Sequence, residues 1–149
     1  MTRSTVLASI FLLASVSAAH SQNTWRDILE VPMTVVGNRA TELGYRADAS
    51  AFHTDMIVGI LYSETTVGLE VDLDLGVEYW IVGACDLDCS DLDLTLNDLQ
   101  GNELFADLLD DATPILTFTA PASGEHILRV SMVECSVEPC SFGYKVYRR

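Results

Sequence analysis

Apolar and polar residues alternate with a period of two along most of the chain beyond residue 55. In residues 68–75 (GLEVDLDL), leucine and valine occupy one face, and acidic side chains occupy the other. This alternation is typical of a β-strand with one face in a core and the other in water. Similar segments follow in series, separated by turns at glycine-containing positions. About eight short strands in this arrangement predict a mainly β fold, an antiparallel β-sandwich of jelly-roll or related Greek-key type. The expected strands span residues 56–62, 68–75, 77–84, 92–98, 99–108, 114–121, 123–135 and 142–149.

A different period precedes these strands. Apolar residues in the segment 23–44 fall near one helical face, which predicts a helix that packs on the domain's own sheet. Pro32 interrupts this pattern, so we expect a kink or two short helices, and Gly44 is a natural stop. The face is expected to consist of Trp25, Ile28, Leu29, Val35, Val36 and Leu43.

The first residues have the three parts of a secretory signal peptide. Arg3 is followed by an apolar run of eleven residues, 6–16, and by the small residues 17–19. That run is short of the roughly 20 residues that span a bilayer. We therefore expect a signal peptide over residues 1–19, a helical segment over 20–50 and a β-sandwich over 51–149. The product is expected to be exported, periplasmic or extracellular, and not inserted in a membrane after cleavage.

The charge of the chain is strongly negative and unevenly distributed. It has 22 acidic and 8 basic residues, a net charge of −14, and no Lys or Arg between Arg46 and Arg129. Such a field repels nucleic acid and anionic lipid and attracts cations and basic partners. The same charge would also serve to keep an exported protein in solution, and the sequence leaves both interpretations open.

Four cysteines indicate two disulfides in an oxidising compartment. Three pairings exist, and local bridges Cys85–Cys89 and Cys135–Cys140 need the least from the fold. A five-residue ring stabilises by about 2 kcal/mol and a bridge over some fifty residues by about 4 kcal/mol, so local bridges would mainly shape loops. The C-x3-C and C-x4-C spacings fit neither a zinc ribbon nor a C-x-x-C redox motif.

Residues 76–147 resemble the bacterial pre-peptidase C-terminal (PPC) domain. The shared elements are Gly-x-x-Tyr at 76–79, Asp-Leu-Asp-Leu at 91–94, an Asp-x-x-Gly hairpin at 98–101, and FTAPASGEHILRV at 118–130, with His126 where the family has an aromatic residue. The resemblance implies a β-sandwich that acts in secretion, localisation or substrate binding, and in some members holds calcium. Those domains accompany secreted peptidases and this sequence shows no catalytic domain, so it looks closer to small exported bacterial proteins in which a helix precedes the same core. For such a protein the implied role is a free-standing binding or envelope function.

An acidic run beside the first cysteine pair is the leading candidate site. Carboxylates, with backbone carbonyls and water, are the ligands that calcium prefers, and a Cys85–Cys89 bridge would fold the run back on itself. The spacing is not that of an EF-hand, and solvated turn residues are the alternative interpretation. The calcium candidates are Asp86, Asp88, Asp91 and Asp93, with Asp110 and Asp111 as a second loop that could close over them.

Catalytic patterns are weak in this sequence. Ser123, Glu125 and His126 are close in the chain, but a tight turn does not place serine on imidazole. The aromatic residues Tyr79, Trp80, Tyr144 and Tyr147 would form a carbohydrate or peptide platform if exposed, although core packing is favoured. The leading hypothesis is an exported, non-catalytic binding module with an unidentified protein or carbohydrate ligand. The alternatives are a secreted hydrolase that uses carboxylates, and an envelope assembly protein whose sheet edge takes a partner strand.

Overall fold

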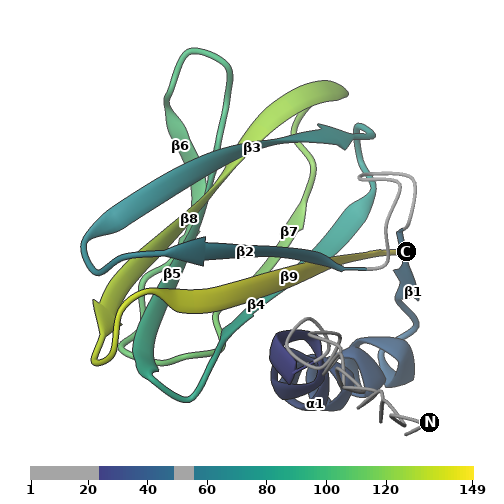
Figure 1. Ribbon diagram of the computed structural model, residues 1–149. Coiled ribbons are helices and arrows are strands. Elements are labelled where there is room, and N and C mark those ends of the chain that lie inside the picture. The colour runs from purple at the N-terminus through teal and green to yellow at the C-terminus, as the bar shows by residue number, and fades with distance from the viewer. Residues whose placement is uncertain (1–23, 49–55) are drawn as a thin grey trace, which may run out of the picture.

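The computed structural model describes residues 24–48 and 56–149, with side chains from residue 28 onward. It contains one helix followed by nine strands (Figure 1). The elements are α1 (Thr24–Glu42), β1 (Arg46–Ala47), β2 (Ile57–Leu61), β3 (Thr65–Leu73), β4 (Glu78–Cys85), β5 (Cys89–Asn97), β6 (Glu103–Asp107), β7 (Ile115–Thr119), β8 (Gly124–Cys135) and β9 (Cys140–Arg148). The expected signal peptide lies outside the described residues and stays a prediction.

The strands form two antiparallel sheets that pack face to face. One sheet has the order β1-β9-β4-β7, with β2 also pairing with β9, and the other has the order β3-β8-β5-β6. From β2 onward, the first strand pairs with the last, the second with the next to last, and so on inward. This is the jelly-roll arrangement, so the predicted sandwich is confirmed. Strand β1, only two residues long, is one that the alternation did not predict.

The core lies between the sheets and is built by the predicted alternation. Leu92, Leu94 and Leu96 of β5 are fully buried, and so are Leu128 and Val130 on the neighbouring strand β8. Each such leucine stabilises the fold by roughly 1.5–3 kcal/mol through burial. One expected core residue is misplaced, because Leu75 lies beyond the end of β3 and is exposed.

Helix α1 covers the outer face of the first sheet, against β4 and β9. Its contact stripe runs through Leu29, Met33 and Ala40, which are all fully buried. Val35 and Leu43 were also expected on this face, but both are exposed. Residues on one helical face recur every three or four positions, and Val35, two positions after Met33, therefore lies outside the contact stripe. Trp25 lies where side chains are not described.

The helix also continues through Pro32, so the expected alternative of two short helices is wrong. Packing against the sheet offsets the hydrogen bond that proline removes. No helix in the described part of the chain has the length and apolar character needed to cross a membrane.

Both predicted disulfides, Cys85–Cys89 and Cys135–Cys140, are present, each with its Cα atoms 5.9 Å apart. Local bridges were expected mainly to shape loops. In the fold, however, each bridge joins the two sheets, because β4 and β9 belong to one sheet and β5 and β8 to the other. Cys89 and Cys135 are also direct partners across β5 and β8, so the two bridges lie side by side. They fasten one end of the sandwich.

Candidate functional site: the disulfide end

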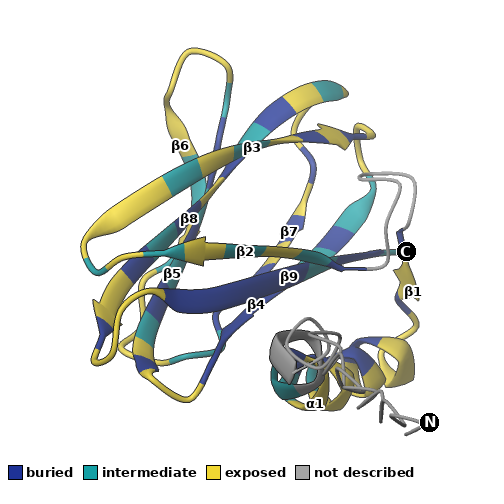
Figure 2. Cartoon of the chain, viewed as in Figure 1, coloured by how far each residue is buried: buried dark blue, intermediate teal, exposed yellow. Residues whose placement is uncertain are grey.

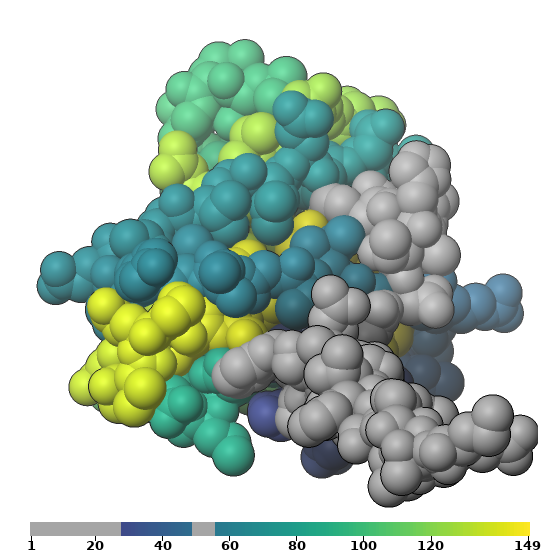
Figure 3. All heavy atoms as spheres, in the orientation of Figure 1, coloured from purple at the N-terminus to yellow at the C-terminus, as the bar shows by residue number. Residues whose placement is uncertain are grey.

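Four loops meet at the end of the sandwich that the disulfides fasten, at the lower left of Figure 1. We call this surface the disulfide end. It consists of the β2–β3 loop (62–64), the β4–β5 loop (86–88), the β6–β7 loop (108–114) and the β8–β9 loop (136–139). Figure 3 shows the first, second and fourth of these loops adjacent to one another on the surface. Loops carried by a rigid sandwich are where binding residues are most often found.

Hydrogen bonds lock three of these loops to one another. The Ser63 hydroxyl donates to the Cys135 carbonyl at 3.1 Å, and the Ser63 amide donates to the Glu138 carboxylate at 2.8 Å. The Ser136 amide and hydroxyl both donate to the Asp88 carbonyl, at 2.7 and 2.8 Å. The β8–β9 loop therefore holds the β2–β3 loop on one side and the β4–β5 loop on the other.

The remaining loop, between β6 and β7, is fixed by hydrogen bonds to strands β4 and β5. The Leu92 amide donates to the Asp111 carbonyl at 2.9 Å, and the Cys85 amide donates to the Ala112 carbonyl at 3.2 Å. The carboxylate of Asp107 accepts from the amides of Leu109 and Ile115, the latter at 2.7 Å, and so closes the base of the loop. All four loops are therefore held in place by contacts within the protein itself.

Every one of these fixed loops exposes a large apolar side chain. The exposed fractions are Leu87 91%, Leu109 65%, Val137 64%, Leu108 60% and Tyr62 56%. Figure 2 shows these loops as largely exposed, whereas the strands β4 and β9 beneath them are largely buried. Several large apolar groups gathered on one surface of a soluble protein are characteristic of an interaction site.

Acidic groups surround the apolar side chains. The exposed ones are Glu64, Asp88, Asp110, Asp111, Glu134 and Glu138. The four loops contain no Lys or Arg. Half-buried Asp91 has its pKa raised, first by desolvation and then by the neighbouring charges of Asp110, Glu134 and Asp111. Burial likewise raises the pKa of Asp93, together with the charges of Asp91 and Asp107. The disulfide end is thus an apolar surface in a negative field.

The predicted calcium candidates do not all share one environment. Asp86 is buried, and its Oδ2 atom accepts from the Ser141 amide at 2.6 Å, which ties the β4–β5 loop to β9. Asp88 is exposed, whereas Asp91 and Asp93 lie half-buried on β5. Across residues 24–48 and 56–149, no group of three or more His, Cys, Asp or Glu side chains is gathered so that it could hold a metal ion. Calcium binding therefore stays a prediction.

The other residues singled out in the sequence have structural roles. The Ser123 hydroxyl accepts from the Leu75 amide at 2.8 Å, and buried His126 contacts the Gly124 carbonyl through Nδ1 at 2.9 Å. These two side chains therefore have backbone partners instead of forming a nucleophile–base pair. Core packing of the aromatic residues is confirmed for Tyr79, Tyr144 and Tyr147, which are all buried. Trp80 is half-buried and packs edge-on against Tyr45, with ring centroids 5.6 Å apart.

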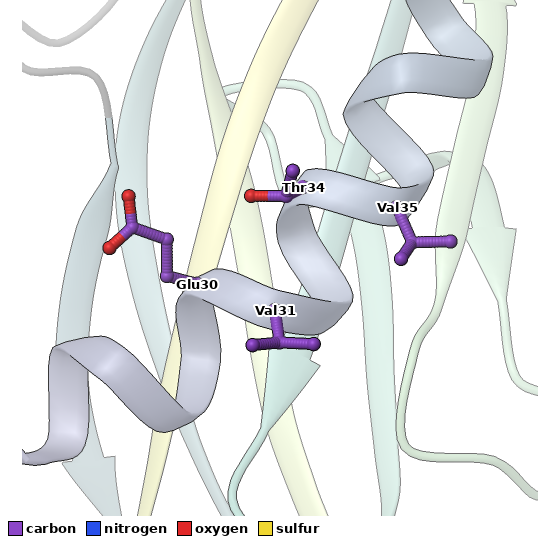
Figure 4. Close-up of a pocket in the computed structure, with 4 residues that line it drawn as sticks. All are labelled: Glu30, Val31, Thr34 and Val35. Atoms are coloured by element: carbon purple, nitrogen blue, oxygen red, sulfur yellow. The ribbon is translucent and has the colours of Figure 1, made fainter.

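Three hollows lie away from the disulfide end, and the one on β3 and β8 is lined by Glu70, Val71, Asp72 and Glu125. Another is on the outer side of α1, where Figure 4 shows Val31 and Val35 on one side of the helix and Glu30 and Thr34 on the other. The third lies beside the end of the chain and is lined by Gly44, Arg46, Ala47, Arg148 and Arg149. Arg148 and Arg149 are paired with Asp48, Asp74 and Glu78, so their charge is largely neutralised.

The apolar residues of the disulfide end were not predicted from the sequence. A signal for them exists, since Leu87 lies between two aspartates within the C-x3-C ring, and Val137 lies within the C-x4-C ring. A large apolar residue at the centre of a ring too short to fold over it must point outward. These positions identify Leu87 and Val137 as exposed residues only once the cysteine pairing is known.

Comparisons with known proteins do not assign this chain to a family. No family model matches it, and no curated protein sequence matches it. A solved structure that it resembles is PliG of Aeromonas hydrophila, a periplasmic lysozyme inhibitor of g-type lysozyme. The identity is 13%, the TM-score is 0.49, and the match covers 63% of this chain and 84% of that one. A likeness this distant says nothing about what the present chain binds, and the PPC resemblance stays a prediction.

Proposed function

We propose that this chain is an exported, non-catalytic binding protein whose binding face is the disulfide end. The observation that carries the proposal is the exposure of Tyr62, Leu87, Leu108, Leu109 and Val137 on four loops that are locked by disulfides and hydrogen bonds. The role that the PPC resemblance implies, binding without chemistry, belongs to the same class.

Rigidity and apolar exposure together favour recognition. Binding normally costs about 0.5–1.5 kcal/mol for each flexible side chain that is immobilised, and loops that are already fixed lose less freedom. Exposing a leucine such as Leu87 has no benefit for an isolated soluble domain, whereas burying it against a partner stabilises the complex by about 1.5–3 kcal/mol. Few residues at the centre of an interface supply most of its affinity.

The experiment is affinity capture with matched variants. Purified wild-type protein, the double variant Leu87→Asp/Val137→Asp and the control Leu75→Asp/Leu99→Asp are immobilised and exposed to the exported proteins of the producing cells. The control residues are also exposed leucines, 65% and 57%, but lie at the opposite end of the sandwich. A protein retained by wild type and control but not by Leu87→Asp/Val137→Asp, and binding again when purified, supports the proposal. Equal retention by all three proteins refutes it.

A second candidate function, assembly through a sheet edge, has one specific observation in its favour. Strand β2 pairs with β9 alone among the described strands, and it exposes Val58 and Ile60. An apolar edge strand is a template for a partner strand. If this edge assembles copies of the chain, the mass in solution will rise with concentration and Ile60→Lys will abolish that rise. A wild-type mass that stays monomeric up to millimolar concentration excludes self-assembly.

Calcium stabilisation is a further proposal, and its support is the density of carboxylates in residues 86–93 and 110–111. Bound calcium would stabilise the native state by mass action, so 5 mM calcium would raise the melting temperature and a chelator would reverse the rise. Magnesium and sodium chloride at equal ionic strength are the controls. A calcium curve that coincides with them eliminates a specific site.

A further inference from the structure

We infer that the partner of the disulfide end is a basic protein surface with an apolar centre bordered by Lys and Arg side chains. This inference rests on the proposed function and adds the chemistry of the partner. Its basis is the combination, on the same four loops, of exposed apolar side chains with a rim that carries only negative charge.

Negative charge on the loops of the disulfide end has no basic group beside it within those loops. Six exposed acidic residues lie on or beside the loops of the disulfide end, which contain no basic residue. Arg46, Arg148 and Arg149 instead gather at the far end of β9, around the hollow beside Gly44. An unbalanced negative charge of this kind attracts a basic partner to these loops and speeds association.

The acidic rim is crowded, which adds to the case for a cationic partner. The pKa of Asp91 is raised first by desolvation and then by the neighbouring charges of Asp110, Glu134 and Asp111, which all disfavour its ionisation. A Lys or Arg side chain placed over this group would relieve that repulsion, whereas an acidic or neutral partner would not. The Ser90 hydroxyl donates to the Glu134 carboxylate at 2.8 Å, so this part of the rim is held in place.

The apolar centre distinguishes this surface from a simple polyanion. A solvated acidic patch attracts any cation, and such attraction fades within about 10 Å at 0.1 M salt. The side chains of Leu87 and Val137 project from rings that are closed by disulfides, so they would enter a recess in the partner while the rim pairs with its charges. A partner should therefore bind tightly only if it has both apolar and basic side chains.

Three synthetic probes of equal length separate these chemistries. The first is an amphipathic helical peptide of Leu and Lys, the second replaces Lys by Glu, and the third replaces Leu by Ser. Binding to the full chain is measured by calorimetry in 0.05 M and 0.3 M NaCl. We expect the Leu/Lys peptide to bind at least about tenfold more tightly than either of the others, and to weaken with salt.

Variants then locate the binding on the protein. Leu87→Asp/Val137→Asp should lower the affinity for the Leu/Lys peptide by about tenfold or more. Glu64→Gln/Asp88→Asn should weaken it by about threefold or more by lowering the association rate. The matched control Asp72→Asn/Glu125→Gln removes the same charge at the opposite end of β3 and β8, and should leave binding within about twofold.

The outcomes separate the inference from the proposed function. If the Leu87/Val137 variant loses binding but the rim variant and salt have no effect, the binding face is correct and the basic partner is wrong. If Glu64→Gln/Asp88→Asn and Asp72→Asn/Glu125→Gln weaken binding equally, the peptide responds only to the net charge of the protein, and the inference is wrong. If no probe binds, or if the Leu87/Val137 variant binds as wild type does, both the inference and the proposed binding face are refuted.

Discussion

Asp86, Asp88 and Asp91 are separated by two or three positions in the chain but stand in three environments. Asp86 is buried and accepts a backbone hydrogen bond, Asp88 is exposed, and Asp91 is half-buried among other acidic groups. The difference arises because a stapled corner separates Asp86 and Asp88, on the loop, from Asp91, on β5. Neighbouring aspartates therefore serve different purposes, and one shared ligand role does not describe them.

Removing the charge of Asp91 should stabilise the protein at neutral pH. Its pKa is raised in the folded state, so the native protein binds this proton more tightly than the unfolded chain does. The ionised form therefore costs stability above the raised pKa, and that cost vanishes below the ordinary value near pH 3.9. Because exposed charge pairs contribute about 0.2–1 kcal/mol, Asp91→Asn should raise the melting temperature at pH 7 by up to about 4 °C.

Thermal melts at pH 7 and pH 3 test whether Asp91→Asn stabilises the protein by removing a charge. At pH 3 the Asp91→Asn variant and the wild type should melt together, because the carboxyl group is protonated in both states of the wild type. Asp72→Asn, which removes one exposed charge at the other end of the sandwich, controls for net charge. A stabilisation that persists unchanged at pH 3 would mean that the Asn side chain, and not the lost charge, is responsible.

Alternation in the sequence identified the core residues of β5, since Leu92, Leu94 and Leu96 are buried as predicted, although it misplaced Leu75. It could not identify Asp86 as a buried residue. Its burial depends on Ser141, which is 55 positions away in the chain and is brought beside it only by the pairing of β4 with β9. Periodicity describes which face a residue occupies, not which distant segment will cover it.

At the level of whole elements, helix α1 shows how packing reverses an intrinsic preference. Gly37 is buried in the middle of the helix, where glycine is normally unfavourable by about 1 kcal/mol relative to alanine. A Cβ atom at this position would overlap the hydroxyl of Tyr147, which is itself buried on β9. Glycine therefore permits the close approach that lets α1 cover the sheet.

Gly37→Ala should accordingly destabilise the protein, by about 1 kcal/mol, although alanine is the better helix former. The overlap costs about 1–3 kcal/mol in a packed interior, which exceeds the gain in helix propensity. In a Tyr147→Phe background the hydroxyl is gone, and the nearest ring carbon would be 3.1 Å from the new Cβ atom. Urea melts of the four proteins in this cycle should show a smaller cost of Gly37→Ala in that background. An equal cost in both backgrounds would place the strain elsewhere.

The disulfides act on a pair of sheets and not only on loops. Cys85→Ala/Cys89→Ala should lower the free energy of unfolding by about 2 kcal/mol, the value expected for a five-residue ring, and leave the fold intact. The same change should lower the affinity for the Leu/Lys peptide, because residues 86–88 lose their fixed conformation. Urea melts and calorimetry measure the two effects. Gly37→Ala, which should destabilise the protein at α1 and away from the four loops, is the control for generic destabilisation. A variant that loses stability but keeps full affinity would show that the ring is not needed to present Leu87.

For the molecule as a whole, the sequence was sufficient to predict the layered β architecture but not the surface that it creates. Turns and alternation predict strands β2 to β9 but not β1, whereas the meeting of residues 62–64, 86–88, 108–114 and 136–139 follows from the jelly-roll order. Predicting that order requires knowing which distant strands pair. The same order places the basic groups around Arg148 away from the acidic loops, a separation that a net charge of −14 does not reveal.

That net charge leads to a prediction for the stability of the whole molecule. With 22 acidic and 8 basic residues, repulsion opposes the compact state at pH 7. Raising NaCl from 0.01 M to 1 M shortens the screening length from about 30 Å to about 3 Å, so the melting temperature should rise. The exposed ion pairs, such as Arg148 with Asp74, are weakened by the same salt, but they are too few to reverse the sign. At pH 4, where many carboxyl groups are protonated, the rise should shrink to less than half. A rise of equal size at pH 4 and pH 7 would show that salt acts through the apolar core and not through charge.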